Sequence, residues 1–173
     1  MNDETTNLAD RISLRPVEKP ADEEFLIALY HTTRDDIEQA PIDEEQKRSL
    51  SLMQYTAQRH HYETNHSNSN HDIILFDGKS VGRLWTARYE TEIIVVDIAL
   101  LPEYRNLGIG TVLMRSLFDE AEQTGRVLHF HVLKMNANAI RFYERLKCKY
   151  IDSEAKTHFK MRWRAEDKII AGE

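Results

Sequence analysis

The stretch Leu100-Leu101-Pro102-Glu103-Tyr104-Arg105-Asn106-Leu107-Gly108-Ile109-Gly110 joins an apolar run to a helical pattern. The apolar run, Ile93 to Leu101, predicts a strand, and the pattern from Gly108 to about Thr124 predicts a helix. The first N–H groups of a helix have no partner within it, and the helix dipole places positive charge there. Glycines without a Cβ let an anion approach this backbone closely. The stretch therefore predicts a phosphate or pyrophosphate site just past the end of a strand.

The glycine spacing alone is also compatible with other loops. The dinucleotide-binding fingerprint needs a third glycine three residues after the second, but Leu113 occupies that position. A P-loop needs Gly-Lys-Ser/Thr after four intervening residues, and the stretch lacks it. On the glycines alone, a tight turn that binds nothing remains the alternative to a ligand site.

Two motifs together resemble the GNAT superfamily of N-acetyltransferases. Arg105-Asn106-Leu107-Gly108-Ile109-Gly110 resembles the R/Q-x-x-G-x-G/A pyrophosphate loop of that family, and residues 97–104 resemble its fourth strand and splayed loop. Downstream, Asn136-Ala137-Asn138-Ala139-Ile140-Arg141-Phe142-Tyr143-Glu144-Arg145-Leu146 resembles its N-x-x-A-x-x-h-Y-E-x-L helix, where h is apolar. The motifs stand in the family's order, and the similarity covers roughly residues 11 to 163. One departure is Lys147-Cys148, where the family usually has Gly-Phe, so the turn loses its easy left-handed residue.

The resemblance implies an α/β (α+β) fold with a mixed, mainly antiparallel sheet of six to seven strands, about four flanking helices and splayed central parallel strands. Hydrophobic periodicity and turn residues agree with it. Strands are expected at 11–17, 72–76, 80–89, 92–100, 127–133, 150–151 and 157–163, and helices at about 20–33, 41–62, 108–124 and 136–146. Asp43 and Asn136 are expected to cap helices, and Gly125 to end one.

We expect residues 11–163 to form a single acetyltransferase domain, with a flexible N-terminus at 1–10 and a polar C-terminal tail at 164–173. The polar segment 63–72 is expected to be an exposed loop. His60, His61, His66 and His71 lie in or near this loop, but no cysteine joins them and they share no rigid spacing, so we predict no metal site.

Composition favours a cytoplasmic protein. The 173 residues, 41% hydrophobic and 30% charged, suit one soluble domain with a sizeable core. The net charge of −6 disfavours non-specific binding to nucleic acid or anionic membranes, and favours a cationic or amine substrate. Cys148 is the only cysteine, so no intrachain disulfide can form. No apolar run approaches the roughly 20 residues of a spanning helix, and the polar, acidic N-terminus is unlike a signal peptide.

The resemblance implies acetyl-CoA as the cosubstrate. Backbone amides of the glycine loop would surround its pyrophosphate, and the Arg105 side chain would add charge-assisted hydrogen bonds. Backbone groups of Ile98 and Leu100 would pair with the pantetheine arm where the fourth and fifth strands splay. The residues implied for cosubstrate binding are Ile98, Leu100, Arg105, Asn106, Leu107, Gly108, Ile109, Gly110, Thr111, Asn136, Ala139 and Phe142.

Acetyl transfer requires a deprotonated amine, a polarised thioester carbonyl and a protonated or stabilised thiolate. Tyr143 matches the family's tyrosine near the sulfur, where its O–H would protonate the thiolate, and a core tyrosine is the alternative. Glu92 matches a strand position where some relatives carry a catalytic glutamate, and Asp97 is a second candidate base. His131, with an intrinsic pKa of about 6.5, and a water chain are further candidates.

The leading hypothesis is an N-acetyltransferase that transfers an acetyl group from acetyl-CoA to a primary amine of a small molecule or peptide, by direct attack in a ternary complex. A non-catalytic acyl-CoA-binding sensor or interaction module is the alternative, because the base is undecided and the Lys147-Cys148 turn is altered. A domain that binds nucleotide phosphates through the same glycines is a third. The first two helices would form one wall of the acceptor site, and both a monomer and a homodimer stay open.

Overall fold

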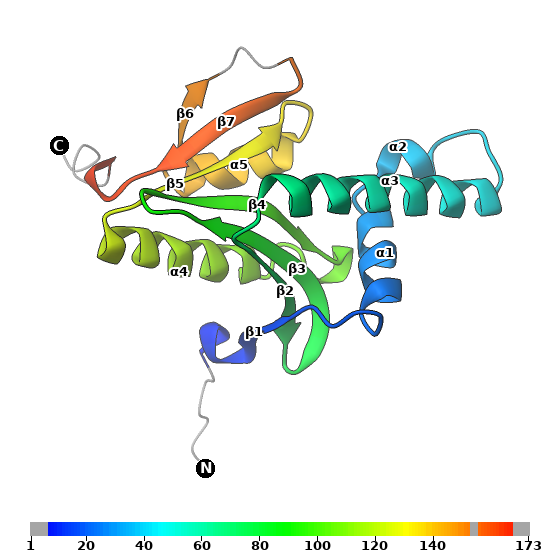
Figure 1. Ribbon diagram of the computed structural model, residues 1–173, viewed down its shortest axis with the longest axis horizontal. Helices are drawn as coiled ribbons and strands as arrows, with labels where there is room; N and C mark the ends of the chain where they lie inside the picture. The colour runs from blue at the N-terminus through cyan, green and yellow to red at the C-terminus, as the bar shows by residue number, and fades with distance from the viewer. Residues whose placement is uncertain (1–6, 153–155, 168–173) are drawn as a thin grey trace. The chain divides into compact units, whose positions relative to one another are not determined.

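The computed structural model describes residues 7–152 and 156–167. Contacts between residues divide the chain into two compact units. Unit 1 comprises Met1–Trp85 and Asp97–Ile109, and unit 2 comprises Thr86–Val96 and Gly110–Glu173. The elements, labelled in Figure 1, are η1 (Leu8–Arg11), β1 (Ile12–Pro16), α1 (Glu23–His31), α2 (Asp35–Glu38), α3 (Glu44–Asn65), β2 (Ser69–Phe76), β3 (Lys79–Arg88), β4 (Glu92–Leu100), η2 (Pro102–Tyr104), α4 (Ile109–Thr124), β5 (Val127–Leu133), α5 (Ala137–Arg145), β6 (Lys149–Asp152) and β7 (His158–Trp163).

The strands form a seven-stranded sheet in the order β1-β2-β3-β4-β5-β7-β6. The β1–β2, β5–β7 and β6–β7 pairs are antiparallel, and β4 and β5 are parallel. The parallel ladder is short, running from Glu92↔Val127 to Val95↔Phe130, although β4 itself continues to Leu100. The predicted fold class, a mixed and mainly antiparallel sheet with one central parallel pair, is therefore confirmed.

Unit 1 packs helices α1 and α3 against strand β2. Leu26, Tyr30, Tyr55 and Ile73 form its buried cluster. Helix α3 begins with the expected cap, since the Asp43 carboxylate accepts from the Gln46 backbone while the Gln46 side chain accepts from the Asp43 backbone.

A close backbone approach in unit 1 fixes the end of β4. The hairpin before it turns at Asp77 and Gly78, whose φ angles are 50° and 75°, as the Asp-Gly pair predicts. In β3, a Cβ added at Gly82 would lie 2.3 Å from the Ala99 carbonyl oxygen. Only glycine fits there, so the last residues of β4 lie tightly against β3, just before the glycine loop.

Unit 2 is built on helix α4 and strands β5 and β7. Leu113, Met114, Leu117, Phe118 and Ala121 form the buried face of α4. The ring of Phe118 stacks on Trp163 of β7 with centroids 4.5 Å apart. Helix α4 ends as predicted at Gly125, which has a φ of 67°.

Helix α5 has the predicted start and an unusual end. The Asn136 side chain accepts a hydrogen bond from the Ala139 backbone at 3.0 Å, which confirms the cap. At the other end, Lys147 donates to the Glu144 carbonyl and Cys148 to the Tyr143 carbonyl, at 2.9 and 3.0 Å. This is the Schellman pattern. Lys147 occupies its left-handed position with a φ of 63°, although it is not glycine.

Three expectations differ from the structure. The exposed loop predicted at 63–72 is wrong, because α3 continues to Asn65 and β2 begins at Ser69. Strand β1 imposes this pairing, since Val17 donates to the His71 carbonyl at 3.0 Å. The short helix α2 was not predicted, and Leu8–Arg11, which falls largely within the expected flexible N-terminus, forms η1. Residues 168–173 of the expected tail lie outside the described residues, as do 1–6.

An ion pair joins β1 to the start of α1, and its loss should destabilise unit 1. Arg15 donates two 2.7 Å hydrogen bonds to Asp22, and this lowers the pKa of the buried Asp22 carboxyl from 3.8 to about 2. Because the pKa in the folded state is below that of the unfolded chain, the stabilisation is present above about pH 4 and is lost as the pH falls towards 2.

We expect Asp22→Asn to lower the free energy of unfolding by about 2 kcal/mol at pH 7, and by progressively less below pH 4. Urea titrations between pH 7 and pH 2.5 measure this loss. Asp35→Asn, which changes an exposed carboxylate in α2, is the control and should have little effect. An equal loss for Asp22→Asn at pH 2.5 and pH 7 would contradict the prediction.

Candidate functional site

The loop between β4 and α4 has the geometry of an anion site. Asn106 and Gly108 both adopt left-handed backbone conformations, with φ angles of 62° and 88°. Helix α4 then begins at Ile109, and the N–H groups of its first turn have no acceptor within the helix. The Leu8 side chain lies over Gly108, because an added Cβ would stand 2.9 Å from Leu8 Cδ2. The chain therefore turns at the position where the sequence predicts the phosphate loop, and η1 lies next to this turn.

The Arg105 side chain braces this loop against the end of α1. Its Nε donates to the Leu100 carbonyl at 2.9 Å. Its Nη2 donates to the Thr32 carbonyl at 3.1 Å and to the Thr32 hydroxyl at 3.2 Å. Thr32 is the C-terminal cap of α1. The arginine therefore holds the strand end, the glycine loop and helix α1 together, in addition to any charge it offers a ligand.

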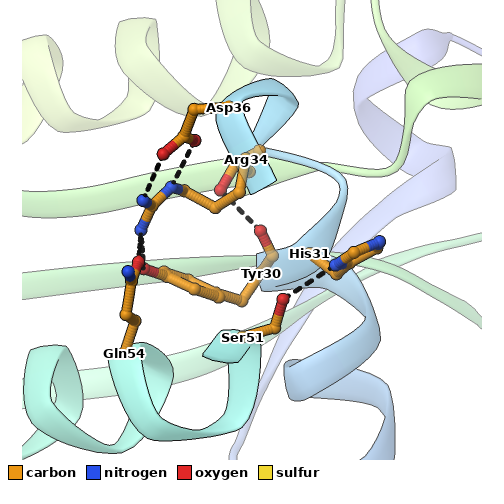
Figure 2. A network of polar contacts seen from close by, with 7 residues as sticks. Tyr30, His31, Arg34, Asp36, Ser51 and Gln54 are labelled. Carbon is orange, nitrogen blue, oxygen red and sulfur yellow. Dashed lines mark hydrogen bonds and ion pairs between the residues drawn. The ribbon is translucent and has the colours of Figure 1, made fainter. Parts of the chain in front are cut away.

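A polar network fixes the turn that follows Thr32 (Figure 2). Arg34 makes a two-pronged contact with Asp36 at 2.8 and 2.7 Å, and its Nη1 donates to the Tyr30 hydroxyl and the Gln54 amide oxygen. Because Gln54 belongs to α3, the arginine ties the α1–α2 turn to that helix.

The neighbouring His31 makes a second link of the same kind. Its Nδ1 lies 2.8 Å from the buried Ser51 hydroxyl of α3 (Figure 2). Its Nε2 lies 3.1 Å from Glu38 of α2. Ser51 is 1% exposed, so this Ser-His-Glu chain is a buried bridge between helices rather than an accessible nucleophile. Side chains thus tie together α1 and α3, the two helices expected to form one wall of the acceptor site, and the short helix α2.

A buried arginine holds Asp97, one of the candidate bases. Arg83 lies on β3 and is 2% exposed. Its Nε donates to Asp97 at 2.6 Å and its Nη2 to the Gln58 amide oxygen at 2.6 Å. Its Nη1 is buried and has no partner among the described residues. The carboxylate of Asp97 is therefore fixed in position, with part of its surface open.

Burial and the charges of Arg83 and Asp97 shift the pKa values of two aromatic neighbours, His71 and Tyr62. His71 stacks on Trp85 with centroids 4.0 Å apart. Burial, and then the positive charge of Arg83, lower the pKa of His71 to about 4, so this histidine is neutral at pH 7. Burial, and then the charge of Asp97, raise the pKa of Tyr62.

In unit 2, the candidate base Glu92 contacts a histidine that sequence reasoning missed. The Glu92 carboxylate lies 2.6 Å from Nε2 of His129, whose ring is buried, and Nδ1 of that ring has no partner among the described residues. Glu92 stands at the first pair of the parallel ladder. His131, the histidine singled out from the sequence, is exposed on β5.

Tyr143 lies on the buried face of α5. Its ring centroid is 4.1 Å from that of Phe130 and 5.1 Å from that of Phe142. The Phe142 ring in turn borders the start of α4, because a Cβ added at Gly110 would lie 3.4 Å from it. The second glycine of the loop and the two aromatic residues of the α5 motif therefore come together in unit 2. The Asn136 side chain is engaged in capping α5.

The predicted site residues are divided between the two units. Unit 1 contains Asp97, Ile98, Leu100 and the loop from Arg105 to Ile109, and unit 2 contains Glu92, Gly110, Thr111, Asn136, Ala139, Phe142 and Tyr143. Arg83, His129 and Thr32 were missed. A partial signal existed for Arg83 and His129, since each lies between two non-polar residues inside a predicted strand, although His131 has the same setting.

Other kinds of site receive no support from residues 7–152 and 156–167. They contain no group of three or more His, Cys, Asp or Glu side chains that could hold a metal ion. None of their helices combines the length and apolar character needed to cross a bilayer.

Comparison with known sequences decides the family. The profile described as "Acetyltransferase (GNAT) family" matches residues 28–147, most of the chain and both motifs. The chain belongs to the GNAT acetyltransferase family. Family membership supports acetyl transfer with acetyl-CoA as the cosubstrate, as the motifs predicted.

The individual GNAT relatives either have low sequence identity to this chain or match only a part of it. N-alpha-acetyltransferase 60 of Xenopus tropicalis is 39% identical over 54 residues, which cover 29% of this chain and only 22% of that protein. The PaiA N-acetyltransferase from Thermoplasma acidophilum, solved with coenzyme A, has a TM-score of 0.64 at 18% identity, over 88% of this chain and 98% of its own. Arabidopsis thaliana Naa50, solved with the bisubstrate analogue CoA-Ac-MVNAL, has a TM-score of 0.56 at 14% identity, over 88% and 98%. These likenesses establish the GNAT fold.

The hydrogen bonds from Arg105 to Leu100 and Thr32 can be tested by substitution of the arginine. Lysine keeps the positive charge but lacks the planar fork that reaches two carbonyls and a hydroxyl at once. We expect Arg105→Lys and Arg105→Gln both to weaken acetyl-CoA binding about tenfold in calorimetry, since hydrogen bonds from a charged group contribute roughly 1.5–3 kcal/mol. Affinity near that of the native protein in Arg105→Lys, with loss only in Arg105→Gln, would show that charge alone matters.

Proposed function

We propose that this GNAT-family chain is an N-acetyltransferase that moves the acetyl group of acetyl-CoA to a primary amine of a small molecule or peptide, by direct attack in a ternary complex. The loop from Arg105 to Gly110 carries the proposal, because it combines two left-handed residues with the start of α4. The bisubstrate analogue in Naa50 supports a peptide as one class of acceptor. The lone, buried Cys148 agrees with a reducing cytoplasm. We propose no nucleic-acid or membrane partner, and a monomer or homodimer.

The cosubstrate would be held mainly by backbone groups. Amides from Asn106 to Thr111 would receive the diphosphate, and Arg105 would add charge while bracing the loop. The early end of the β4–β5 ladder supports pairing of the pantetheine arm with Ile98 and Leu100, since both follow the last registered pair at Val95. Ala139 and Phe142 on α5 would pack beside it, and Asn136 would hold that helix in register.

Acetyl-CoA supplies an already activated thioester. The protein must then provide a proton for the departing thiolate and accept a proton from the attacking amine. We assign Tyr143 to protonate or hydrogen-bond the departing thiolate. Its ring is held by Phe130 and Phe142 on a helix that is capped at both ends, so the position of its hydroxyl is well defined.

We assign Asp97 ahead of Glu92 as the group that accepts the amine proton. Asp97 stands two residues past the last pair of the parallel ladder, on the part of β4 where the thioester would lie. Glu92 stands at the first pair, about 16 Å back along the strand, and its carboxylate is engaged by His129. Arg83 acts as a positioning residue for Asp97, because it fixes one carboxylate oxygen.

The function is tested by measuring thiol release from acetyl-CoA with a panel of amines, peptides and aminoglycosides, alongside calorimetric binding of acetyl-CoA. We expect acetyl-dependent release with at least one amine, and we expect Tyr143→Phe to lower kcat about 10²-fold with little change in acetyl-CoA affinity. No binding at millimolar acetyl-CoA would end the proposal. Tight binding without transfer to any amine would favour an acyl-CoA sensor instead.

The choice of base is tested by paired variants. Asp97→Asn keeps an oxygen for Arg83 but cannot take a proton, so kcat/KM should fall about 10²- to 10³-fold while the melting temperature changes little. Glu92→Gln should keep kcat/KM within about threefold. Rates are measured from pH 6 to 9, and the reverse ranking of the two variants would transfer the role to Glu92.

A further inference from the structure

A hollow of about 390 Å³ lies entirely within unit 2, between α4, the end of α5 and the segment after β7. Its floor includes the stacked rings of Phe118 and Trp163, which are 4% and 3% exposed. The volume falls within the range of small-molecule sites. Charged side chains surround this apolar floor, so the hollow combines the two features that bind a polar organic ligand.

Three cations line the hollow without ion-pair partners. Arg115 of α4, and Arg145 and Lys147 at the end of α5, make no ion pair with any other described residue. In a chain with a net charge of −6, three unpaired cations around one hollow form a local positive field. Asp119 offsets one of the three charges.

The second carboxylate of the hollow, Asp167, has a cationic partner, but one of its oxygens lacks a hydrogen-bond donor among the described residues. Its Oδ1 accepts from Lys149 at 3.0 Å. Its side chain is 9% exposed, and its Oδ2 is buried with no partner among the described residues. A buried carboxylate oxygen without a donor is costly and calls for a missing partner.

The backbone supplies an independent observation. Lys147 adopts a left-handed conformation in the Schellman turn, where glycine would be free of strain. Residues in such strained backbone conformations cluster at active and ligand-binding sites. Here the side chain of Lys147 is the third cation of the hollow.

We propose that this hollow binds a phosphate-bearing small molecule that also carries a hydroxyl or amine donor. Arg115, Arg145 and Lys147 receive the phosphate, and the donor satisfies Asp167. Two sources have this chemistry. One is a free nucleotide, and the other is the 3′-phosphoadenosine end of acetyl-CoA, since Arg115 follows Gly110 by five residues, about 7.5 Å along α4. The second source rests on the proposed function.

The test uses Lys147→Gly, which removes the charge and also relieves the left-handed strain, so the variant should fold with an unchanged or higher melting temperature. Calorimetry measures adenosine 5′-monophosphate and adenosine on the protein without acetyl-CoA. We expect the monophosphate to bind the native protein more tightly than adenosine, and Lys147→Gly to weaken only the monophosphate, about tenfold. Binding should also weaken as salt is raised from 50 to 300 mM.

A second arm compares acetyl-CoA with 3′-dephospho-acetyl-CoA in the same variants. If the native protein binds acetyl-CoA more tightly than 3′-dephospho-acetyl-CoA and Lys147→Gly does not, the hollow binds the 3′-phosphate of the cosubstrate. If Lys147→Gly weakens only the binding of the monophosphate, the hollow binds a separate nucleotide. Lys79→Ala, which removes one charge from unit 1, is the control and should change neither affinity.

If Lys147→Gly alters neither the monophosphate nor the 3′-phosphate preference, the proposal is overturned. The monophosphate arm needs no acetyl transfer. Its failure is therefore distinct from failure of the proposed function, which would show as absent thiol release by the native protein.

Discussion

The unpaired amides at the head of α4 are the constraint on which the rest of the structure depends. A helix that follows a strand after so short a loop leaves several N–H groups without partners. Here Asn106 and Gly108 turn the chain in left-handed conformations, and Arg105 fastens the loop to the end of α1. That brace matters because a diphosphate is bound well only by donors that are already in place. The proposed diphosphate loop and the end of α1 are thus joined by one side chain.

Two buried polar side chains, Arg83 and His129, contact the carboxylates of β4. Arg83 and His129 each sit in a strand whose neighbours are buried hydrophobic residues, and each holds a carboxylate of β4 at 2.6 Å. Burying a polar group without a hydrogen bond, or a charge without a partner, is unfavourable. Replacing a buried pair by well-packed apolar residues is often neutral or stabilising, so neither pair is explained by stability alone. For Arg83, the role that we propose is to hold Asp97 in position.

Local rules predicted much of the fold, and long-range pairing decided the rest. The caps at Asp43 and Asn136 and the end of α4 at Gly125 follow from chemistry within a few residues, and all three were predicted. The choice of His129 over His131 could not be, since it depends on the ladder with β4 ending at Phe130. The contact from Arg105 to Thr32 spans 73 residues of sequence and has no local signal.

The end of α5 shows why a departure from a family motif can carry information. The sequence suggested that Lys147-Cys148 would weaken the turn, yet both Schellman hydrogen bonds form and Cys148 is buried, with the pKa of its thiol raised to about 12 by burial. The turn therefore tolerates lysine at a cost of about 1–2 kcal/mol in backbone conformation. Glycine at position 147 would avoid that cost without disturbing any contact of the turn. A residue that is locally unfavourable, and that adds charge beside two other unpaired cations, is most simply explained by what its ammonium group binds.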